Sequence, residues 1–329
     1  MIRSLLLALA SLAASAAAPV HLAGSIPGPD GGWDLLGVDP ATNRLFVARS
    51  DGLMMVDLAT RKVTPGFVAG KRLHAALAIP GTTIGATTLG ESNELLLFDT
   101  RTGAVKARVP TGKDPDAAAW DSASQKLWVM TPGDGSIDVV DAAAGRRLAT
   151  LKVGGSLELA AADGAGHLFV NVEDRNELVK IDTRRVAVVA RAPLPGCDGP
   201  TGLALAGRVL ISACANGIAR FTAAADLKPL GSAAIGARPD GAFADPARHR
   251  AYIPSGGDGT LAVFDTRGAL PRLMARVSTA KGARTGAVDP RSGRVYLPSA
   301  SYGAAARTGE RPPMVPGSFR LLLVDPSAG

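Results

Sequence analysis

The sequence has little of what several functional classes require. Only 4% of its 329 residues are aromatic, and it contains 2 cysteines and 4 histidines. So few cysteines exclude a disulfide-rich miniature scaffold. Few aromatic rings and no long basic run disfavour nucleic-acid binding, which relies on base stacking and a sustained positive surface. The motifs GxxxxGK, HExxH, CxxCH and GxSxG are also absent, which removes four common enzyme and cofactor assignments.

Long hydrophobic runs are missing after the first 18 residues. At the start, Arg3 precedes an apolar run over residues 5–14 that leads into small residues, which is the pattern of a cleaved secretory signal. A membrane anchor is the alternative, but the run is shorter than a spanning helix needs and two serines interrupt it. We therefore predict a signal peptide over residues 1–18 and a periplasmic or secreted mature chain without a transmembrane segment.

The two cysteines, Cys197 and Cys214, are 17 positions apart. An oxidising compartment allows them to form a disulfide, which is the preferred interpretation. Two free buried thiols or a soft-metal pair are the alternatives, although no CxxC motif supports a metal site.

Turn-forming residues are abundant, with 39 Gly and 23 Pro, and they separate a repeated unit. An apolar stretch that ends in Asp recurs at intervals of 40 to 43 residues, with one final interval of 60, and in one unit Thr222 takes the Asp position. The repeated aspartates are Asp57, Asp99, Asp141, Asp182, Asp265 and Asp325. No segment has helical periodicity, so each unit is predicted to hold short strands separated by turns.

Units of about 40 residues with four short strands are typical of propeller blades. The chain ends complement each other, because residues 19–27 resemble the fourth strand of other units and the last unit stops at Pro326 without one. We predict an all-β, seven-bladed β-propeller in one domain over residues 19–329, closed by an N-terminal strand that completes the last blade. A linear solenoid is the alternative, and it does not explain the complementary ends.

The repeats resemble those of the YVTN-repeat, YncE-like propeller family, whose units read approximately V-x-V-I-D-x-x-T. The best matches are residues 57–60, 99–103 and 265–268, and the fifth unit departs most. The resemblance implies the seven-bladed fold. It does not select a function, because similar propellers serve as binding platforms, lactone hydrolases and cofactor-bearing enzymes.

One position per unit is predicted to face the upper mouth of the channel, which we define as the end where the fourth strand of one blade leads into the next blade. Carboxylates there suit a divalent cation, calcium or a transition metal, or a cationic ligand, and Asp116, Glu158 and Asp240 are the candidate metal ligands. Capping of turns is the alternative role. The seven residues are Asp34, His74, Asp116, Glu158, Thr201, Asp240 and Arg284.

The long interval in the last unit predicts a loop over residues 302–318 above the same mouth. Such loops are binding lids or disordered segments. As a lid, it offers Tyr302, Arg307 and Arg311 to grip a ligand, the arginines through bidentate contacts to a carboxylate or phosphate. The opposite, lower end collects basic residues, including Arg44 and Lys126, which either meet an anionic surface or remain solvated turn residues.

Two functions remain open for a chain of this kind. The first is a monomeric exported propeller that binds a small molecule, ion or partner protein at its upper mouth, where Asp34, Asp116, Asp240, Arg284, Tyr302 and Arg307 are the candidate binding residues. The second is a metal-assisted hydrolase or lyase of a lactone-like substrate at the same mouth. In that case His74, as general base, and Glu158 are the candidate catalytic residues.

Overall fold

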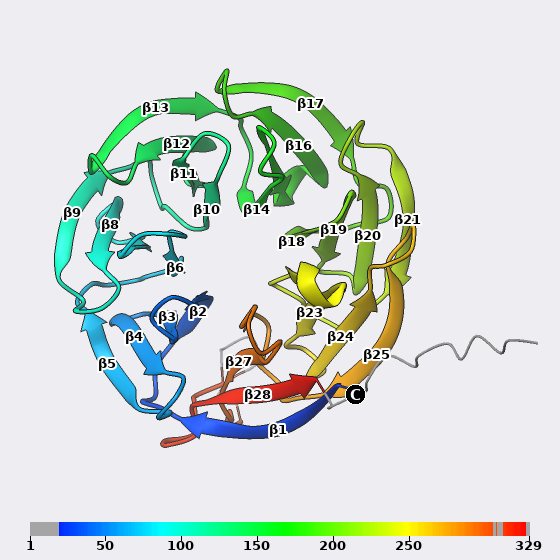
Figure 1. The fold of residues 1–329 in the computed structure, drawn as a ribbon. Helices are drawn as coiled ribbons and strands as arrows, with labels where there is room; N and C mark the ends of the chain where they lie inside the picture. Colours follow the sequence, from blue (N-terminus) through cyan, green and yellow to red (C-terminus); the bar gives the residue numbers. More distant parts are fainter. Residues whose placement is uncertain (1–19, 305–306, 308–311, 327–329) are drawn as a thin grey trace, which may run out of the picture.

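The computed structural model describes residues 20–304, 307 and 312–326, which form seven four-stranded sheets arranged in a ring (Figure 1). The seven sheets confirm the predicted seven-bladed β-propeller. The predicted signal peptide, residues 1–18, lies outside the described residues.

Each blade has four antiparallel strands that follow one another from the channel to the outer rim. The innermost strands are β2 (Trp33–Asp39), β6 (Leu77–Ala78), β10 (Ala118–Asp121), β14 (Leu157–Ala162), β18 (Pro200–Ala206), β22 (Phe243–Asp245) and β26 (Ala287–Val288). The second strands are β3 (Arg44–Arg49), β7 (Ile84–Leu89), β11 (Lys126–Thr131), β15 (His167–Val172), β19 (Val209–Cys214), β23 (Arg250–Ser255) and β27 (Val295–Ser299).

The outer half of each blade is equally regular. The third strands are β4 (Gly52–Asp57), β8 (Glu94–Asp99), β12 (Ser136–Asp141), β16 (Glu177–Asp182), β20 (Ile218–Ala223), β24 (Thr260–Asp265) and β28 (Arg320–Pro326). The outermost strands are β5 (Val63–Val68), β9 (Val105–Pro110), β13 (Arg146–Lys152), β17 (Ala187–Pro193), β21 (Pro229–Ala234), β25 (Arg272–Ser278) and β1 (Val20–Pro27).

Helical structure in the described chain is limited to two single turns, η1 (Glu173–Arg175) and η2 (Pro246–Arg248). Among the described residues there is accordingly no helix with the length and hydrophobicity needed to cross a membrane.

The ring closes through its seventh blade, where the sheet order is β1-β28-β27-β26. Strand β1 pairs antiparallel with β28 from Val20, opposite Pro326, to Pro27, opposite Arg320. Figure 1 shows the first and last strands side by side, with β1 in blue and β28 in red. The predicted closure is therefore confirmed, and it replaces two open strand edges by backbone hydrogen bonds.

The hydrophobic core consists of seven clusters, one between each pair of neighbouring blades. Middle strands are buried on both faces, which is why their sequences are continuous apolar runs and do not alternate with polar residues. Phe46 of blade one and Phe98 of blade two, for example, meet edge to face with ring centroids 5.3 Å apart. Ile26 of β1 belongs to the cluster between blades seven and one, so closure also buries apolar surface.

The aspartates that mark the repeat cap turns at the lower end. Asp57 Oδ1 accepts hydrogen bonds from the backbone N–H groups of Ala59 at 3.0 Å and Thr60 at 2.8 Å. An Asp at this position stabilises a turn by taking up backbone donors that would otherwise lack a partner. The same contact is made by Asp99, Asp141, Asp182 and Asp265. The sequence repeat is therefore structural in origin.

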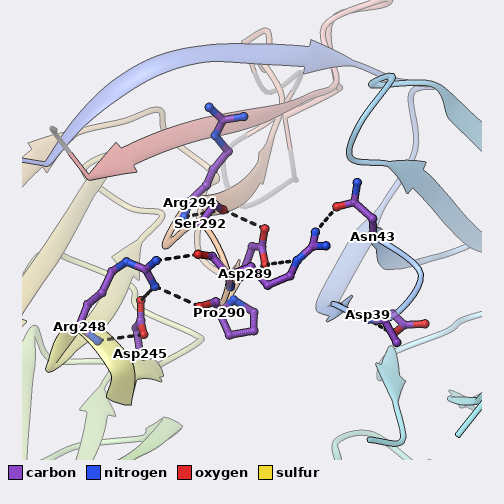
Figure 2. Close-up of polar contacts among 10 residues, drawn as sticks. Asp39, Asn43, Asp245, Arg248, Asp289, Pro290, Ser292 and Arg294 are labelled. Carbon is purple, nitrogen blue, oxygen red and sulfur yellow. Dashed lines mark hydrogen bonds and ion pairs between the residues drawn. The ribbon is translucent and has the colours of Figure 1, made fainter. Parts of the chain in front are cut away.

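Arginine side chains connect neighbouring blades on the lower face beside the closure (Figure 2). Arg248 of blade six pairs with Asp245 at 2.9 Å and donates to the carbonyl oxygens of Pro290, at 3.1 Å, and Arg291, at 2.8 Å, in blade seven. Arg291 in turn donates to the side-chain oxygen of Asn43 in blade one. Three successive blades are linked in this way.

Other cations near the lower end, including the predicted Lys126, also take part in the fold. Lys126 pairs with Asp141 at 2.9 Å, Arg294 pairs with Asp325 at 2.5 Å, and Arg250 is buried. These contacts favour a structural role for the cations, and an anionic partner for this face stays a prediction.

Candidate functional site

The predicted mouth residues lie at or just before the start of the channel-lining strands, where hydrogen bonds between blades hold the backbone. Thr88 of blade two donates its hydroxyl to the carbonyl oxygen of Asp116 in blade three at 2.6 Å. Thr285 of blade seven donates in the same way to the carbonyl oxygen of Asp34 in blade one at 2.8 Å. The backbone at Asp116 and at Asp34 is thus fixed by a neighbouring blade.

Three of the predicted residues form one compact cluster. His74 Nδ1 lies 2.7 Å from Asp34 Oδ2 and 3.8 Å from Asp116 Oδ1. One ligand atom from each residue lies within 4.8 Å of the other two, and all three side chains are half-buried. In a tetrahedral zinc site with bonds of about 2.0–2.2 Å, neighbouring ligand atoms are roughly 3.4 Å apart. The three donors therefore fit a single small cation after minor adjustment.

Burial and mutual repulsion raise the pKa values of the acids around this cluster. Burial, with the negative charge of Asp34 next in weight, raises the pKa of Asp116 to about 7. Burial, followed by the negative charge of Asp116, raises the pKa of Glu158 to about 9. Burial also raises the pKa of Asp240, although the Arg284 guanidinium partly offsets this effect. The acidic side chains at the mouth therefore resist being ionised all at once, and a bound cation would offset the repulsion between their negative charges.

His74 presents only one of its two nitrogens to the carboxylates. Its Nε2 is buried without a hydrogen-bond partner in the described chain, and a Cβ added at Gly90 would lie 2.8 Å from that atom. Burial lowers the pKa of His74, but the hydrogen bond with Asp34 and the charge of Asp116 outweigh it, so the net pKa is raised. Nδ1 is therefore the atom available for a proton or a cation.

The remaining mouth residues are arranged differently. Asp240 Oδ2 accepts a hydrogen bond from Arg284 Nε at 2.6 Å, which joins two predicted ligand-binding residues in an ion pair. Thr201 is buried, and its hydroxyl lies 3.4 Å from the carbonyl oxygen of Pro239. Glu158 is half-buried and is coupled to the cluster by charge, but it is not among the three grouped ligands.

A cavity of ≈ 1040 Å³ opens beside the cluster on the side of blades one, two, six and seven. Asp34, His74, Asp240 and Arg284 contribute to its lining, so it reaches two members of the cluster and the neighbouring ion pair. This volume is close to the upper limit of about 1,000 Å³ for sites that bind small molecules.

The predicted loop over residues 302–318 supplies one wall of the cavity. Tyr302 pairs with Met314 in an isolated antiparallel bridge, and the Gly303 N–H donates to the carbonyl oxygen of Pro313 at 2.9 Å. Tyr302 and Met314 both line the cavity. The described part of the insertion is therefore a hairpin arm, and Arg307 is exposed on it.

The base of this arm is fixed to the connection that follows the closing strand. Asp30 accepts hydrogen bonds from the backbone N–H groups of Gly317 at 2.5 Å and Phe319 at 3.2 Å. The guanidinium of buried Arg49 lies 3.9 Å from the ring centroid of Phe319 and donates to the carbonyl oxygen of Pro29 at 2.7 Å. These contacts hold the cavity wall in place.

Three more charged residues line the cavity without having been predicted from the repeat, namely Arg72, Arg238 and Lys281. Arg72 and Arg238 each stand two positions before a predicted mouth residue, His74 or Asp240. This shared position in the repeat could have predicted that Arg72 and Arg238 lie at the mouth, because each is on the same loop as a predicted mouth residue.

The predicted disulfide is confirmed. Cys197 and Cys214 are bonded with their Cα atoms 5.3 Å apart, and both are buried in the cluster between blades four and five. The bond covalently links the loop that enters blade five to the end of β19.

Comparisons with known proteins support the fold. A chain in a crystal structure of the mitotic checkpoint complex superposes with a TM-score of 0.77 at 12% identity, covering 99% of this chain and 98% of that one. A chain of Kuenenia stuttgartiensis hydrazine synthase gives a TM-score of 0.67 at 16% identity, covering 83% of this chain and 92% of that one. No protein-family model matches the sequence, and neither does any curated protein. The chain belongs to the class of seven-bladed propellers, and its resemblance to the YVTN-repeat family stays a prediction.

Proposed function

We propose that this protein is an exported β-propeller that binds a divalent transition-metal ion, of the zinc class, at its upper mouth through Asp34, His74 and Asp116. The observation that carries this proposal is the convergence of two carboxylates and one imidazole nitrogen within 4.8 Å of one another. A nitrogen donor favours a transition metal over calcium, which prefers oxygen ligands. The disulfide and the predicted signal peptide support an oxidising location outside the cytoplasm.

Titration calorimetry of the EDTA-treated protein with Zn²⁺, and separately with Ca²⁺, tests the proposal. We expect one zinc ion per chain and at least about tenfold weaker binding in His74→Ala, since that variant loses one of three ligands. His167→Ala is the matched control, because His167 Nδ1 lies 2.8 Å from Asp163 Oδ2 but belongs to no such group of three among the described residues. Binding that is absent, or equally strong in His74→Ala, contradicts the proposal, and Asp34→Asn provides a second test if His74→Ala is unfolded.

A metal-assisted hydrolase is the second candidate function, and one observation favours it. The raised pKa of Glu158, about 9, keeps that carboxyl protonated at neutral pH, as a general acid requires. Lactone hydrolysis by the zinc-loaded protein that is abolished by Glu158→Gln, with zinc affinity unchanged, would support this function. If no lactone in a broad panel is hydrolysed, the binding role is favoured.

A further inference from the structure

The charges that line the cavity do not balance locally. Within the described chain, the two carboxylates of the lining are already engaged, Asp34 with His74 at 2.7 Å and Asp240 with Arg284 at 2.6 Å. Arg72, also in the lining, pairs with Asp114 at 2.9 Å.

Two lining cations are left over, Arg238 and Lys281, which make no ion pair with any described residue. They are the lining cations that remain for a ligand.

Backbone hydrogen bonds place Arg238 and Lys281 on stacked loops of the same wall. The Gly256 N–H donates to the carbonyl oxygen of Arg238 at 3.0 Å, and the Gly282 N–H donates to the carbonyl oxygen of Gly256 at 2.8 Å. The Ser299 hydroxyl donates to the carbonyl oxygen of Lys281 at 3.0 Å. Both cations therefore extend from a fixed backbone, which lowers the entropy lost when a ligand binds.

Arg238 also adopts a backbone conformation that arginine disfavours. Its φ is 52°, in the left-handed region, and Arg72 has φ 53° at the equivalent repeat position. At the corresponding place in the loop entering blade seven the chain has Gly282, with φ 88°, for which this conformation carries no steric penalty. Long cationic side chains are thus kept at two positions that suit glycine, and both line the cavity.

Apolar side chains also line the cavity. Trp33, Tyr302 and Met314 line the cavity, and a Cβ added at Gly282 would meet the Tyr302 ring at 3.3 Å and the Trp33 ring at 3.8 Å. The two aromatic side chains therefore flank the loop that carries Lys281. Apolar surface next to positive charge matches a ligand with an apolar body and one anionic end.

We infer that the cavity binds a small organic oxyanion, a carboxylate or phosphate ester with an aromatic or apolar body, whose charged end is held by Arg238 and Lys281. This inference rests on the proposed binding role of the upper mouth and names the ligand class. An oxyanion accepts paired hydrogen bonds from a guanidinium, and a flexible ammonium adds a second contact. The proposed zinc ligands do not include Arg238 or Lys281, so a cation bound by the acidic cluster leaves the side chains of the oxyanion subsite free.

Binding of phenyl phosphate and of phenylacetate to the EDTA-treated protein tests the inference, with benzyl alcohol as the neutral analogue. We expect both anions to bind and benzyl alcohol to bind much more weakly. Arg238→Asn removes the charge but keeps a residue that tolerates the left-handed region, and Lys281→Gln removes the second charge. Each substitution should weaken anion binding about threefold to tenfold, which is typical for losing one partly exposed charge contact.

Lys113→Gln is the matched control, because Lys113 is an exposed lysine of the upper end, in the loop entering blade three, that does not line the cavity. Arg238→Lys, which retains the charge, should retain most of the affinity and guards against a folding defect in Arg238→Asn. The inference is wrong if neither anion binds, if benzyl alcohol binds as tightly, or if Lys113→Gln is as damaging as the two cavity variants. Because no metal is present in this assay, its result is independent of the zinc titration.

Discussion

Acidic residues at the two ends of the propeller behave in opposite ways. At the lower end, backbone N–H groups lower the pKa of Asp57, Asp141 and Asp182, because they stabilise the ionised form. At the upper mouth, burial and neighbouring negative charge raise the pKa of Asp116 and Glu158. The same residue type therefore stabilises the fold at one end and is available for binding or proton transfer at the other.

The raised pKa of Glu158 predicts a stability change with pH that depends on this residue. Its folded-state pKa of about 9 exceeds the ordinary value of 4.5, so burial of the carboxyl costs no folding stability below pH 4.5, where it is protonated in both states. Between pH 4.5 and 9 the unfolded chain ionises more readily, and the stability of the folded protein falls as the pH rises. Glu158→Gln cannot ionise, so it should match the native protein near pH 4 and melt at least about 2 °C higher at pH 8. Thermal melting of the metal-free protein between pH 4 and 8 measures the difference.

Glu91→Gln provides the comparison, since Glu91 is an exposed glutamate in the turn between β7 and β8. It should not change the melting temperature at any pH in this range. An equal gain in both variants would show that the effect comes from total charge and not from the environment of Glu158.

The sequence was sufficient to predict which residues surround the mouth, but not how they pair. The repeat places Asp34, His74 and Asp116 at equivalent positions some 40 residues apart, so their approach follows from the ring. Pairing depends on side-chain conformation and on the bonds between blades, such as Arg284 with Asp240. A pattern within one repeat contains no information about contacts with the next blade.

At the scale of single elements, the innermost strands approach each other so closely that some positions exclude any side chain. A Cβ at Gly37 of β2 would lie 2.2 Å from the carbonyl oxygen of Ala76, beside the start of β6. We expect Gly37→Ala to destabilise the protein by roughly 1–3 kcal/mol, because backbone must shift to admit the methyl group. Chemical denaturation measures the loss of stability.

Gly231→Ala on the outermost strand β21 is the control for this substitution. Its Cβ would meet only the Phe221 ring, at an ordinary distance of 3.8 Å. It should change stability by less than about 0.5 kcal/mol. If both alanine variants are equally stable, close strand packing at the channel is not what requires glycine at Gly37.

The disulfide is the second feature to test at this scale. It joins Cys197 in the loop before β18 to Cys214 at the end of β19, in the unit whose sequence departs most from the repeat. A loop of 17 residues closed by a disulfide is worth about 3 kcal/mol through restriction of the unfolded chain. The double variant Cys197→Ala/Cys214→Ala should lose about that stability in urea denaturation.

Dithiothreitol distinguishes a lost cross-link from damaged packing. It should lower the stability of the native protein to that of the double variant and leave the double variant unchanged. If reduction has no effect on the native protein, the bond does not contribute to its stability.

For the whole molecule, seven interfaces of the same kind form a ring, and the first and last strands of the chain, β1 and β28, meet inside the sheet of blade seven. The repeat period predicted the number of blades correctly because aspartate caps recur wherever a turn of the same shape is needed. Closure was predictable from the same repeat, because the N-terminal segment resembles a fourth strand and the last unit lacks one. The arginine bridges of the lower face were not predictable, because they join turns that are distant in sequence (Figure 2).

The ion pair between Arg294 and Asp325 makes the closing blade sensitive to acid. The Arg294 hydrogen bond lowers the pKa of Asp325, so the stabilisation is present above the ordinary carboxyl pKa near 3.8 and is lost as the pH falls through the lower, folded-state value. Asp325 lies near the end of β28, the strand that pairs with β1. Asp325→Asn removes its charge and should lower the free energy of unfolding by about 1 kcal/mol at pH 7, because the side chains of Arg294 and Asp325 are each less than one-third exposed. The difference from the native protein should shrink toward pH 3. Asp226→Asn breaks the exposed pair of Asp226 with Lys228 inside a single turn and should have a smaller effect at every pH. Melting curves from pH 3 to 7 that show equal losses in both variants would mean that ring closure gains nothing from this ion pair.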